Sequence, residues 1–196
     1  MDIVEKKNFF KAYKTVLEML TDRGNLLPEN LTLTYSQFEI LYESNNLYIY
    51  LETNNEKIYV YFHTLVKSFA KKDFTSTLNK LKKEYGDDLH IIFVTKDKLN
   101  QTLSKDIVRM KQCESFVLKS LVFNITKHYL IPKVEIISTE EEDELLEVYN
   151  TTKLKLPRIL LSDPLVKYYA AKSGNIFRIT RPSKNSGIIL SYRCVK

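Results

Sequence analysis

The chain has 196 residues, of which 44% are hydrophobic and 28% are charged, and this composition is typical of globular proteins and excludes an intrinsically disordered chain. It has no long uninterrupted apolar run and a charged beginning unlike a secretory signal, so we expect a soluble intracellular protein with no membrane partner. The net charge of +6 is unevenly placed, because residues 151–196 hold ten Lys or Arg against one Asp, a net of +9. Such a basic segment contacts nucleic-acid phosphates or an acidic protein surface, or is merely solvated, and charge alone leaves the three open.

The chain begins with two predicted helices. Residues 5–23 carry apolar side chains at three-and-four spacing, and Gly24 follows where a left-handed helix end is expected. Thr34 and Gln37 have the spacing of a capping box, which predicts a short helix through Tyr42.

The next segments predict a sheet. Residues 47–51 and 57–62 are rich in strand-forming residues, and the turn chemistry of residues 53–56 between them predicts a hairpin. A helix is predicted over residues 74–85. Residues 89–95 include consecutive apolar side chains, which are typical of a strand covered on both faces.

The middle of the chain predicts a loop, a strand and two helices. Residues 96–105 are polar and predict a loop before a short helix that ends at Met110, and residues 116–123 are strand-like. A second helix is expected to begin at Ser138 or Thr139, since the glutamates that follow favour the positive end of a helix dipole. Its predicted buried face consists of Leu145, Leu146, Val148 and Tyr149.

The tail, residues 156–196, predicts one short folding unit. Asp163 is a helix cap, Pro164 lies in the first turn, and Gly174 is the expected stop. The following strands predict a hairpin, with turn residues between them; the three segments are 175–180, 182–187 and 188–195.

Motifs in fixed order along this tail carry a family resemblance. They are Leu156-Pro157-Arg158-Ile159, Asp163-Pro164, Tyr168-Tyr169, Gly174, Arg178-Ile179, Arg181-Pro182-Ser183, Gly187 and Tyr192-Arg193. Together they closely resemble the fifth subunit shared by eukaryotic nuclear RNA polymerases and its archaeal equivalent. Residues 17–27, LEMLTDRGNLL, and residues 124–128, NITKH, are similar to two further segments of this family.

The resemblance implies an α/β (α+β) protein of two modules. Residues 1–125 are expected to form a jaw-like N-terminal domain, with a mixed sheet flanked by helices, near downstream duplex DNA. Residues 126–196 are expected to form a small α+β assembly domain that docks on the largest polymerase subunit. The implied function is that of a non-catalytic subunit, one copy per multisubunit DNA-dependent RNA polymerase, with the polymerase core as partner.

Five residues of the tail are candidates for fixing or making the subunit interface, because a guanidinium matches a carboxylate bidentately and the resemblance favours a protein partner. They are Arg158, Asp163, Arg178, Arg181 and Arg193.

Three residues of the first module are candidates for lying near DNA. Thr102, Ser104 and Lys105 occur where the resembled family has a short loop turned toward downstream DNA, and Lys105 is available for a phosphate contact.

No catalytic residue, metal or cofactor is expected. The three histidines lack partners at metal-binding spacing, the four glycines are dispersed, and Cys113 and Cys194 are expected to be reduced structural thiols. Two other classes of function remain open. A free-standing nucleic-acid-binding regulator explains the basic tail, and a metal-dependent nuclease explains Glu52, Glu56 and Lys57.

Within residues 126–196, the sequence departs from the resembled family at three positions that we single out. Ala170 stands where the family usually has glycine, Ile188 where it has arginine, and Val134 where it has histidine. This divergence, in a chain rich in Lys, Asn, Ile and Tyr, points to a large DNA virus that encodes its own polymerase or to a divergent protist. The expected location is accordingly the host cytoplasm and virion, or the nucleus.

Overall fold

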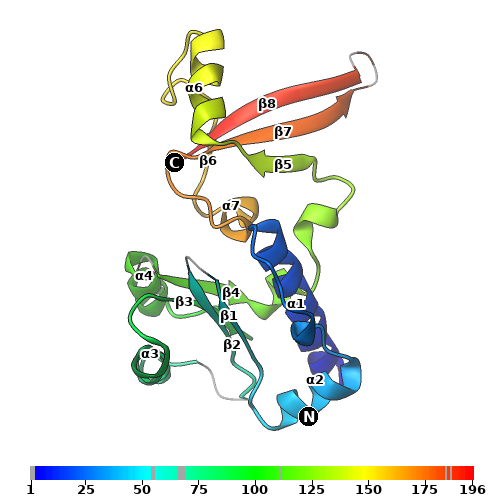
Figure 1. Ribbon diagram of the computed structural model, residues 1–196, viewed down its shortest axis with the longest axis vertical. Coiled ribbons are helices and arrows are strands. Elements are labelled where there is room, and N and C mark those ends of the chain that lie inside the picture. Colours follow the sequence, from blue (N-terminus) through cyan, green and yellow to red (C-terminus); the bar gives the residue numbers. More distant parts are fainter. Residues whose placement is uncertain (1–2, 54–55, 66–68, 111, 184, 186) are drawn as a thin grey trace. The chain divides into compact units, whose positions relative to one another are not determined.

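The computed structural model of the protein describes residues 3–53, 56–65, 69–110, 112–183, 185 and 187–196. These residues divide into two compact units, Met1–Phe123 and Asn124–Lys196, which we call the N-terminal and C-terminal units (Figure 1). The turns expected at 53–56 and 182–187 include residues outside the described part of the chain. Each unit contains helices and one mixed sheet, which confirms the predicted α+β class.

The N-terminal unit is built on a four-stranded sheet of order β1-β2-β3-β4, in which β1 and β2 are antiparallel and the other pairs are parallel. Its described elements are α1 (Ile3–Asp22), η1 (Glu29–Leu31), α2 (Tyr35–Glu43), β1 (Tyr48–Glu52), β2 (Lys57–Phe62), α3 (Lys71–Tyr85), β3 (Leu89–Thr95), α4 (Gln101–Arg109), β4 (Cys113–Val117) and α5 (Leu118–Leu121).

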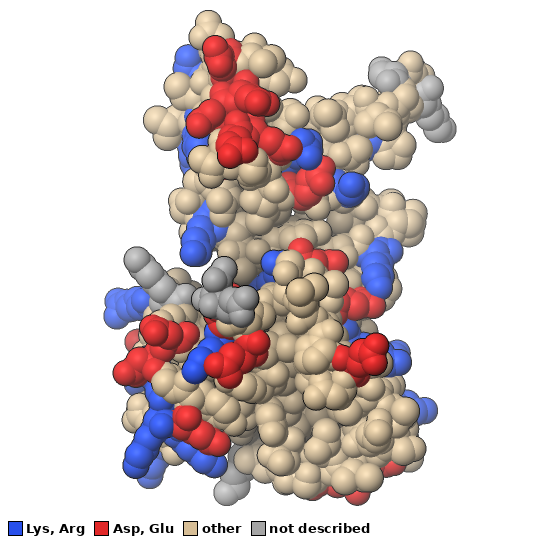
Figure 2. All heavy atoms as spheres, in the orientation of Figure 1, with Lys and Arg blue, Asp and Glu red and all other residues tan. Residues whose placement is uncertain are grey.

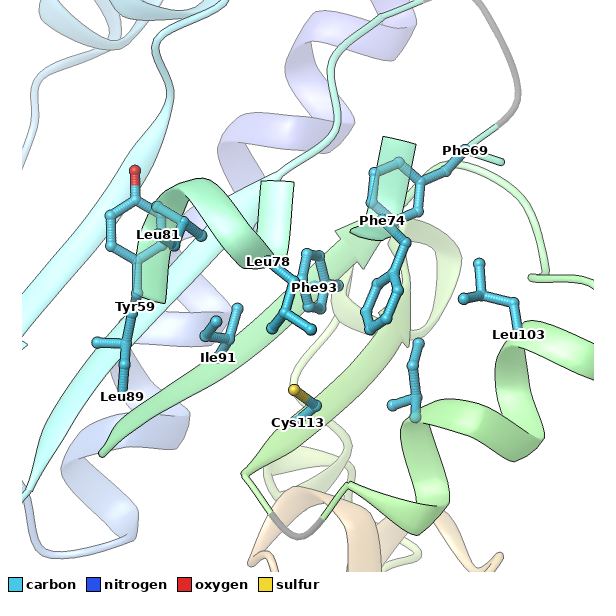
Figure 3. Packing of buried hydrophobic residues seen from close by; sticks show 11 residues of the cluster. Tyr59, Phe69, Phe74, Leu78, Leu81, Leu89, Ile91, Phe93, Leu103 and Cys113 are labelled. Atoms are coloured by element: carbon cyan, nitrogen blue, oxygen red, sulfur yellow. The ribbon is translucent and has the colours of Figure 1, made fainter. Parts of the chain in front are cut away.

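Helices cover both faces of this sheet. On one face, Ile91 and Phe93 of β3 pack against Phe74 and Leu78 of α3, and α4 adds Leu103 (Figure 3). On the other face lies α1, whose Tyr13 ring is 5.8 Å from the Phe62 ring at the end of β2. The expectation that residues 89–95 form a strand covered on both sides is therefore confirmed.

Local signals define the ends of the first helices. Gly24 has a φ of 90°, and the N–H of Asn25 donates to the Leu20 carbonyl at 3.0 Å, which is the bond that closes a left-handed helix end. At α2, the Thr34 hydroxyl accepts from the Gln37 N–H while the Gln37 side chain accepts from the Thr34 N–H, so the predicted capping box is present.

Two expectations for the middle of the chain are wrong. The predicted loop 96–105 ends at Asn100, because α4 begins at Gln101 and buries Leu103 and Ile107 one turn apart. The strand-like run 116–123 leaves the sheet at Val117, and Leu118 begins the short helix α5, which buries Leu118 and Leu121. In both places, the spacing of buried apolar residues is helical.

The C-terminal unit has a sheet of order β5-β7-β8-β6, antiparallel except for the two-residue pairing of β6 with the end of β8. Its described elements are η2 (Ile125–Lys127), β5 (Lys133–Ile136), α6 (Thr139–Val148), β6 (Arg158–Ile159), α7 (Pro164–Tyr168), β7 (Ile176–Ser183) and β8 (Gly187–Val195).

Two small apolar clusters hold this unit together, one on each face of its sheet. Val166 of α7 packs with Phe177 and Ile179 of β7 on one face. On the other face, Leu145 of α6 packs with Ile176 and Cys194. Figure 1 shows the β7–β8 hairpin continuing past both helices, so its far part has neither face covered by them.

Three details of the C-terminal unit differ from expectation. Val148 and Tyr149 are exposed, whereas Glu142 is buried with Leu145, because residues three apart share a helix face. The helix α7 ends at Tyr168, well before Gly174, and Ala170 takes the left-handed position with a φ of 50°.

Candidate functional site

Three of the predicted interface arginines are exposed and available. Arg158 lies on β6, Arg181 on β7 and Arg193 on β8. Within the described residues, none of the three makes an ion pair or a side-chain hydrogen bond. An exposed guanidinium without an internal partner is free to meet a carboxylate or phosphate on another molecule.

The sheet register distributes these arginines over two faces. Arg193 is opposite Phe177 and Arg181 is opposite Ile189, so both arginines lie on the face that packs against α7. Arg158 is opposite Cys194, whose side chain belongs to the cluster under α6 on the other face. The structure therefore brings Arg181 and Arg193 to one face and separates Arg158 from them.

Arg178, in contrast, pairs with carboxylates of the C-terminal unit itself. Its Nε donates to Glu135 of β5 at 2.8 Å, and its Nη1 lies 3.4 Å from a carboxylate oxygen of Glu141 on α6. The hydrogen bond from Arg178 lowers the pKa of the Glu135 carboxyl. Arg178 thus ties β5, β7 and α6 together, and its contribution to an interface would be through their geometry.

Asp163 also acts within the unit. Its carboxylate accepts the Leu165 N–H at 2.9 Å, and Pro164 follows in the first turn of α7, so the predicted helix cap is present. Asp163 fixes the start of α7 beside the sheet face that carries Arg181 and Arg193.

An ion pair with a buried glutamate was not predicted in this unit. Glu142, which is 5% exposed, pairs with Lys153, and the Lys153 ammonium also donates to the Gly174 carbonyl at 3.2 Å. This pair joins α6 to the turn before β7. The signal was present in the sequence, because Glu142 precedes the apolar Leu145 by three residues and so shares its face.

A second internal contact links the segment 124–128 to the tyrosine pair of the tail. The Asn124 amide donates to the hydroxyl of the buried Tyr168 at 3.0 Å, while its oxygen accepts from the N–H of Thr126. The segment 124–128 is therefore anchored to α7 through the first tyrosine of the pair.

The residues predicted to lie near DNA are on the helix α4. Thr102 and Lys105 are exposed, whereas Ser104 is half-buried and donates to the Leu99 carbonyl at 3.5 Å. Arg109 is exposed and follows Thr102 and Lys105 on the same helix face, at a spacing of three and then four residues. Arg109 was missed because residues 96–105 were expected to be a loop, so no helix face shared by Thr102, Lys105 and Arg109 was expected.

A charged network joins α1 to the sheet of the N-terminal unit. Arg23 makes a bidentate contact with Glu114 of β4, at 3.0 and 2.8 Å, and His90 Nε2 is 2.7 Å from the same carboxylate. Burial would raise the pKa of Glu114, but the hydrogen bond from His90 and the Arg23 guanidinium hold it below its ordinary value. The arginine of the LEMLTDRG segment thus has a structural partner.

The carboxylates that suggested a nuclease are engaged in local contacts. Glu52 accepts a hydrogen bond from the Tyr50 hydroxyl at 2.8 Å and pairs with Lys57 at 3.3 Å, and these two contacts lower its pKa. Glu56 lies 3.6 Å from His90. No group of three or more His, Cys, Asp or Glu among the described residues is arranged to hold a metal ion.

None of the helices in the described part of the chain combines the length and the apolar character that a membrane crossing requires. α1 is the longest of them, with 20 residues, and several of its turns carry lysine or glutamate.

Comparisons with known proteins cover nearly the whole chain. Residues 123–195 match the family described as RNA polymerase Rpb5, C-terminal domain. The rpabc1 subunit of DNA-directed RNA polymerases I, II, and III of Dictyostelium discoideum is 30% identical, over 93% of this chain and 94% of the relative. Subunit 5C of DNA-directed RNA polymerase V of Arabidopsis thaliana is 29% identical, over 98% of this chain and 85% of the relative.

An archaeal relative is more similar over a shorter span. The DNA-directed RNA polymerase subunit Rpo5 of Pyrococcus abyssi is 48% identical, over 37% of this chain and 89% of the relative. Similarity along nearly the full chain to one group of proteins, together with the Rpb5 match over the C-terminal unit, identifies the family. The chain belongs to the Rpb5 family of DNA-directed RNA polymerase subunits.

Proposed function

We propose that this chain is a non-catalytic subunit of a multisubunit DNA-directed RNA polymerase and that its C-terminal unit attaches it to the largest subunit. The observation that carries the first statement is the similarity, over nearly the full length of both chains, to named polymerase subunits. The second is supported by exposed arginines on the C-terminal unit that have no internal partner in the described residues.

Arg181 and Arg193 are the proposed centre of this attachment. They share one sheet face and are held there by a continuous antiparallel register between β7 and β8. Arg178 and Asp163 support them indirectly, through the ties to α6 and the cap of α7. We expect the partner surface to carry carboxylates, because a guanidinium pairs with them in a fixed fork geometry.

A pull-down of the tagged full-length chain from its native or infected cells tests both statements. Wild type is compared with the double variant Arg181→Ala plus Arg193→Ala. The matched control is Lys80→Ala plus Lys83→Ala, which removes the same charge from exposed positions on α3. We expect the large polymerase subunits with wild type and with the control, and a loss of at least about tenfold with the arginine variant.

The outcomes separate the two statements. If wild type brings down no polymerase subunit yet binds duplex DNA alone with a steep salt dependence, the chain is a free-standing regulator and the subunit role is wrong. If the arginine variant recovers as much polymerase as the control, the subunit role stands and the docking surface lies elsewhere.

We also propose that the N-terminal unit lies beside downstream duplex DNA, with the exposed face of α4 toward the phosphates. Thr102, Lys105 and Arg109 supply one hydroxyl and two cationic groups along this face. Three such groups are too few for tight binding alone, but they suffice to guide a duplex that the polymerase already holds.

Site-specific crosslinking in the assembled polymerase tests this placement. Both natural cysteines are buried, so a photoreactive group attached to a Thr102→Cys variant would be selective. The control is Ser76→Cys, an exposed position on α3. We expect crosslinks from position 102 to the duplex ahead of the active centre and few from position 76; equal yields would reject the proposed role of α4.

The location of the chain should follow that of its polymerase. We propose the nucleus for a cellular source and the cytoplasm and virion for a viral one. Fractionation with an antibody against the chain, compared with the distribution of the large polymerase subunits, distinguishes these.

A further inference from the structure

We propose that the outer edge of β8, over residues 188–192, binds an extended apolar segment of a polymerase subunit as an added strand, with carboxylates of that segment meeting Arg181 and Arg193. We call this edge the β8 free edge. The inference rests on the proposed function and adds to it the mode of attachment.

The free edge arises from the shortness of β6. β6 pairs with β8 only at Cys194 and Val195, and no other described strand borders this side of β8. The Cys194 N–H points to that side, where it donates to the Pro157 carbonyl at 2.8 Å. Because backbone groups alternate along a strand, the N–H groups of Ile188, Leu190 and Tyr192 point to the same side.

The side chains at this edge are apolar on both faces of the sheet. Ile188, Ile189 and Leu190 are 70%, 45% and 51% exposed, and successive residues point to opposite faces. In Figure 2 the projecting hairpin is mostly uncharged, in contrast to the dense acidic cluster over α6. An added strand would cover apolar surface above and below the sheet while satisfying the outward backbone groups.

This edge lacks the features that normally prevent strand addition. Residues 188–192 include no lysine, no proline and no other charged residue, and the pairing of β8 with β7 runs without a bulge from Gly187 to Cys194. Exposed edge strands of proteins that act alone are usually interrupted by such features. The edge is therefore suited to a partner strand.

The arginines indicate the chemistry of that partner and disfavour a second copy of this chain. Arg181 lies opposite Ile189, and Arg193 follows Ile189 by four residues on the same face, about 13 Å along the strand at 3.3 Å per residue. Two β8 edges pairing with each other would place four arginines on one face of the joined sheet, and residues 187–195 supply no carboxylate to pair with them. A segment with apolar residues between two carboxylates, spaced about four residues apart, instead fits both features.

Backbone substitution distinguishes strand addition from ordinary side-chain contact. Leu190→Ala removes the side chain, whereas Leu190→Pro also removes an N–H that faces outward and is not needed by β7. We expect Leu190→Ala to lower the amount of polymerase recovered in the pull-down about threefold. Leu190→Pro should lower it by at least about a further tenfold, because the backbone hydrogen bond from residue 190 to the added strand is lost. Circular dichroism and thermal unfolding of each free variant establish that it is folded.

Hydrogen exchange supplies a second readout that does not depend on a variant. The probe is the wild-type chain, free and in the polymerase purified through its tag. We expect the amides of Ile188, Leu190 and Tyr192 to become protected only in the polymerase.

The outcomes of the two experiments separate the mode of attachment from the subunit role. Polymerase recovery without protection of these amides, or with equal losses for Leu190→Ala and Leu190→Pro, would overturn the strand-addition mode and leave the subunit role intact. Absence of polymerase from the wild-type pull-down would instead reject the proposed function. Protection in the free chain that increases with concentration, together with dimer formation, would identify a second copy as the occupant and reject the proposal.

Discussion

The N-terminal and C-terminal units bury their sheets to different extents. The N-terminal sheet is covered by helices on both faces, and its central strand β3 is buried along almost its whole length. The C-terminal sheet is covered only near its base, by α6 and α7, and three successive apolar residues of its hairpin are exposed. The first unit therefore covers its own sheet, while the second leaves apolar sheet surface that a partner can cover.

Some of the arginines show the same contrast. Arg23 of the N-terminal unit is satisfied by Glu114, whereas three arginines of the C-terminal unit have no partner within the described residues. If the C-terminal unit docks as we propose, stability and attachment are assigned to different parts of one chain. The substitutions below test this assignment, two in each unit.

The largest effect is expected in the core of the N-terminal unit. Phe93→Ala should lower the free energy of unfolding of this unit by about 4 kcal/mol, because the Phe93 ring is fully buried among Tyr61, Phe69 and Phe74. Denaturant unfolding measures the loss. Val108→Ala, at an exposed position on α4, is the control and should be nearly neutral. A loss for Phe93→Ala below about 1 kcal/mol would contradict the self-sufficient core.

The next effect sharpens the comparison of charges. Glu114→Gln should cost about 3 kcal/mol at neutral pH, because it leaves the Arg23 guanidinium without its bidentate partner. Since the folded pKa of Glu114 is lowered, its stabilisation is present above the ordinary carboxyl pKa and is lost as the pH falls through the folded value.

The difference between wild type and Glu114→Gln should accordingly shrink in acid. Unfolding curves collected from about pH 7 to about pH 3 would measure it. Asp87→Asn, an exposed carboxylate of the same unit, is the control and should track wild type throughout. A difference that is constant over this range would show that the carboxylate charge is not the cause.

In the C-terminal unit, Asp163→Ala should cost about 1 kcal/mol, because the Leu165 N–H loses its acceptor at the start of α7. The same variant should weaken polymerase recovery moderately, since α7 packs under the face that carries the two arginines. Asp163→Asn, which can still accept this bond, should restore most of both. If Asp163→Ala and Asp163→Asn lower recovery equally, the carboxylate charge itself contacts the partner.

The smallest expected effect is a gain in the stability of the C-terminal unit. Ala170 has a φ of 50°, a conformation that costs an L-residue about 1–2 kcal/mol, whereas glycine adopts it freely. The greater backbone entropy of glycine in the unfolded chain offsets about 0.5–1 kcal/mol of this. Ala170→Gly should therefore stabilise the C-terminal unit by about 0.5 kcal/mol, measured by thermal unfolding. Ala171→Gly, whose neighbourhood is buried, should instead destabilise it.

The sequence predicted elements whose signals are local. The helix end at Gly24, the capping box at Thr34 and the cap at Asp163 each depend on residues within one turn, and all three are present. The switch from strand to helix at Val117 was missed, because a short apolar run has no period that separates a buried strand from a buried helix.

The candidate site was predictable as a set of residue types but not in its internal arrangement. Arg178 and Arg181 are the same residue type and lie three residues apart, yet only Arg178 forms ion pairs with Glu135 and Glu141. Those partners come from β5 and α6, so the distinction depends on tertiary register, which no local pattern specifies. The free edge of β8 likewise depends on the length of β6, a strand of two residues.

The two buried cysteines give each unit its own kinetic reporter. Cys113 lies in the apolar cluster between the N-terminal sheet and α3, and Cys194 lies beneath α6 in the C-terminal unit. A thiol reagent can reach either sulfur only when the surrounding structure opens. Burial also raises the pKa of Cys113, which lowers the fraction of reactive thiolate. The rates at which the two positions are modified in the native protein therefore measure how often each unit opens. Polymerase binding should slow the reaction of Cys194 far more than that of Cys113.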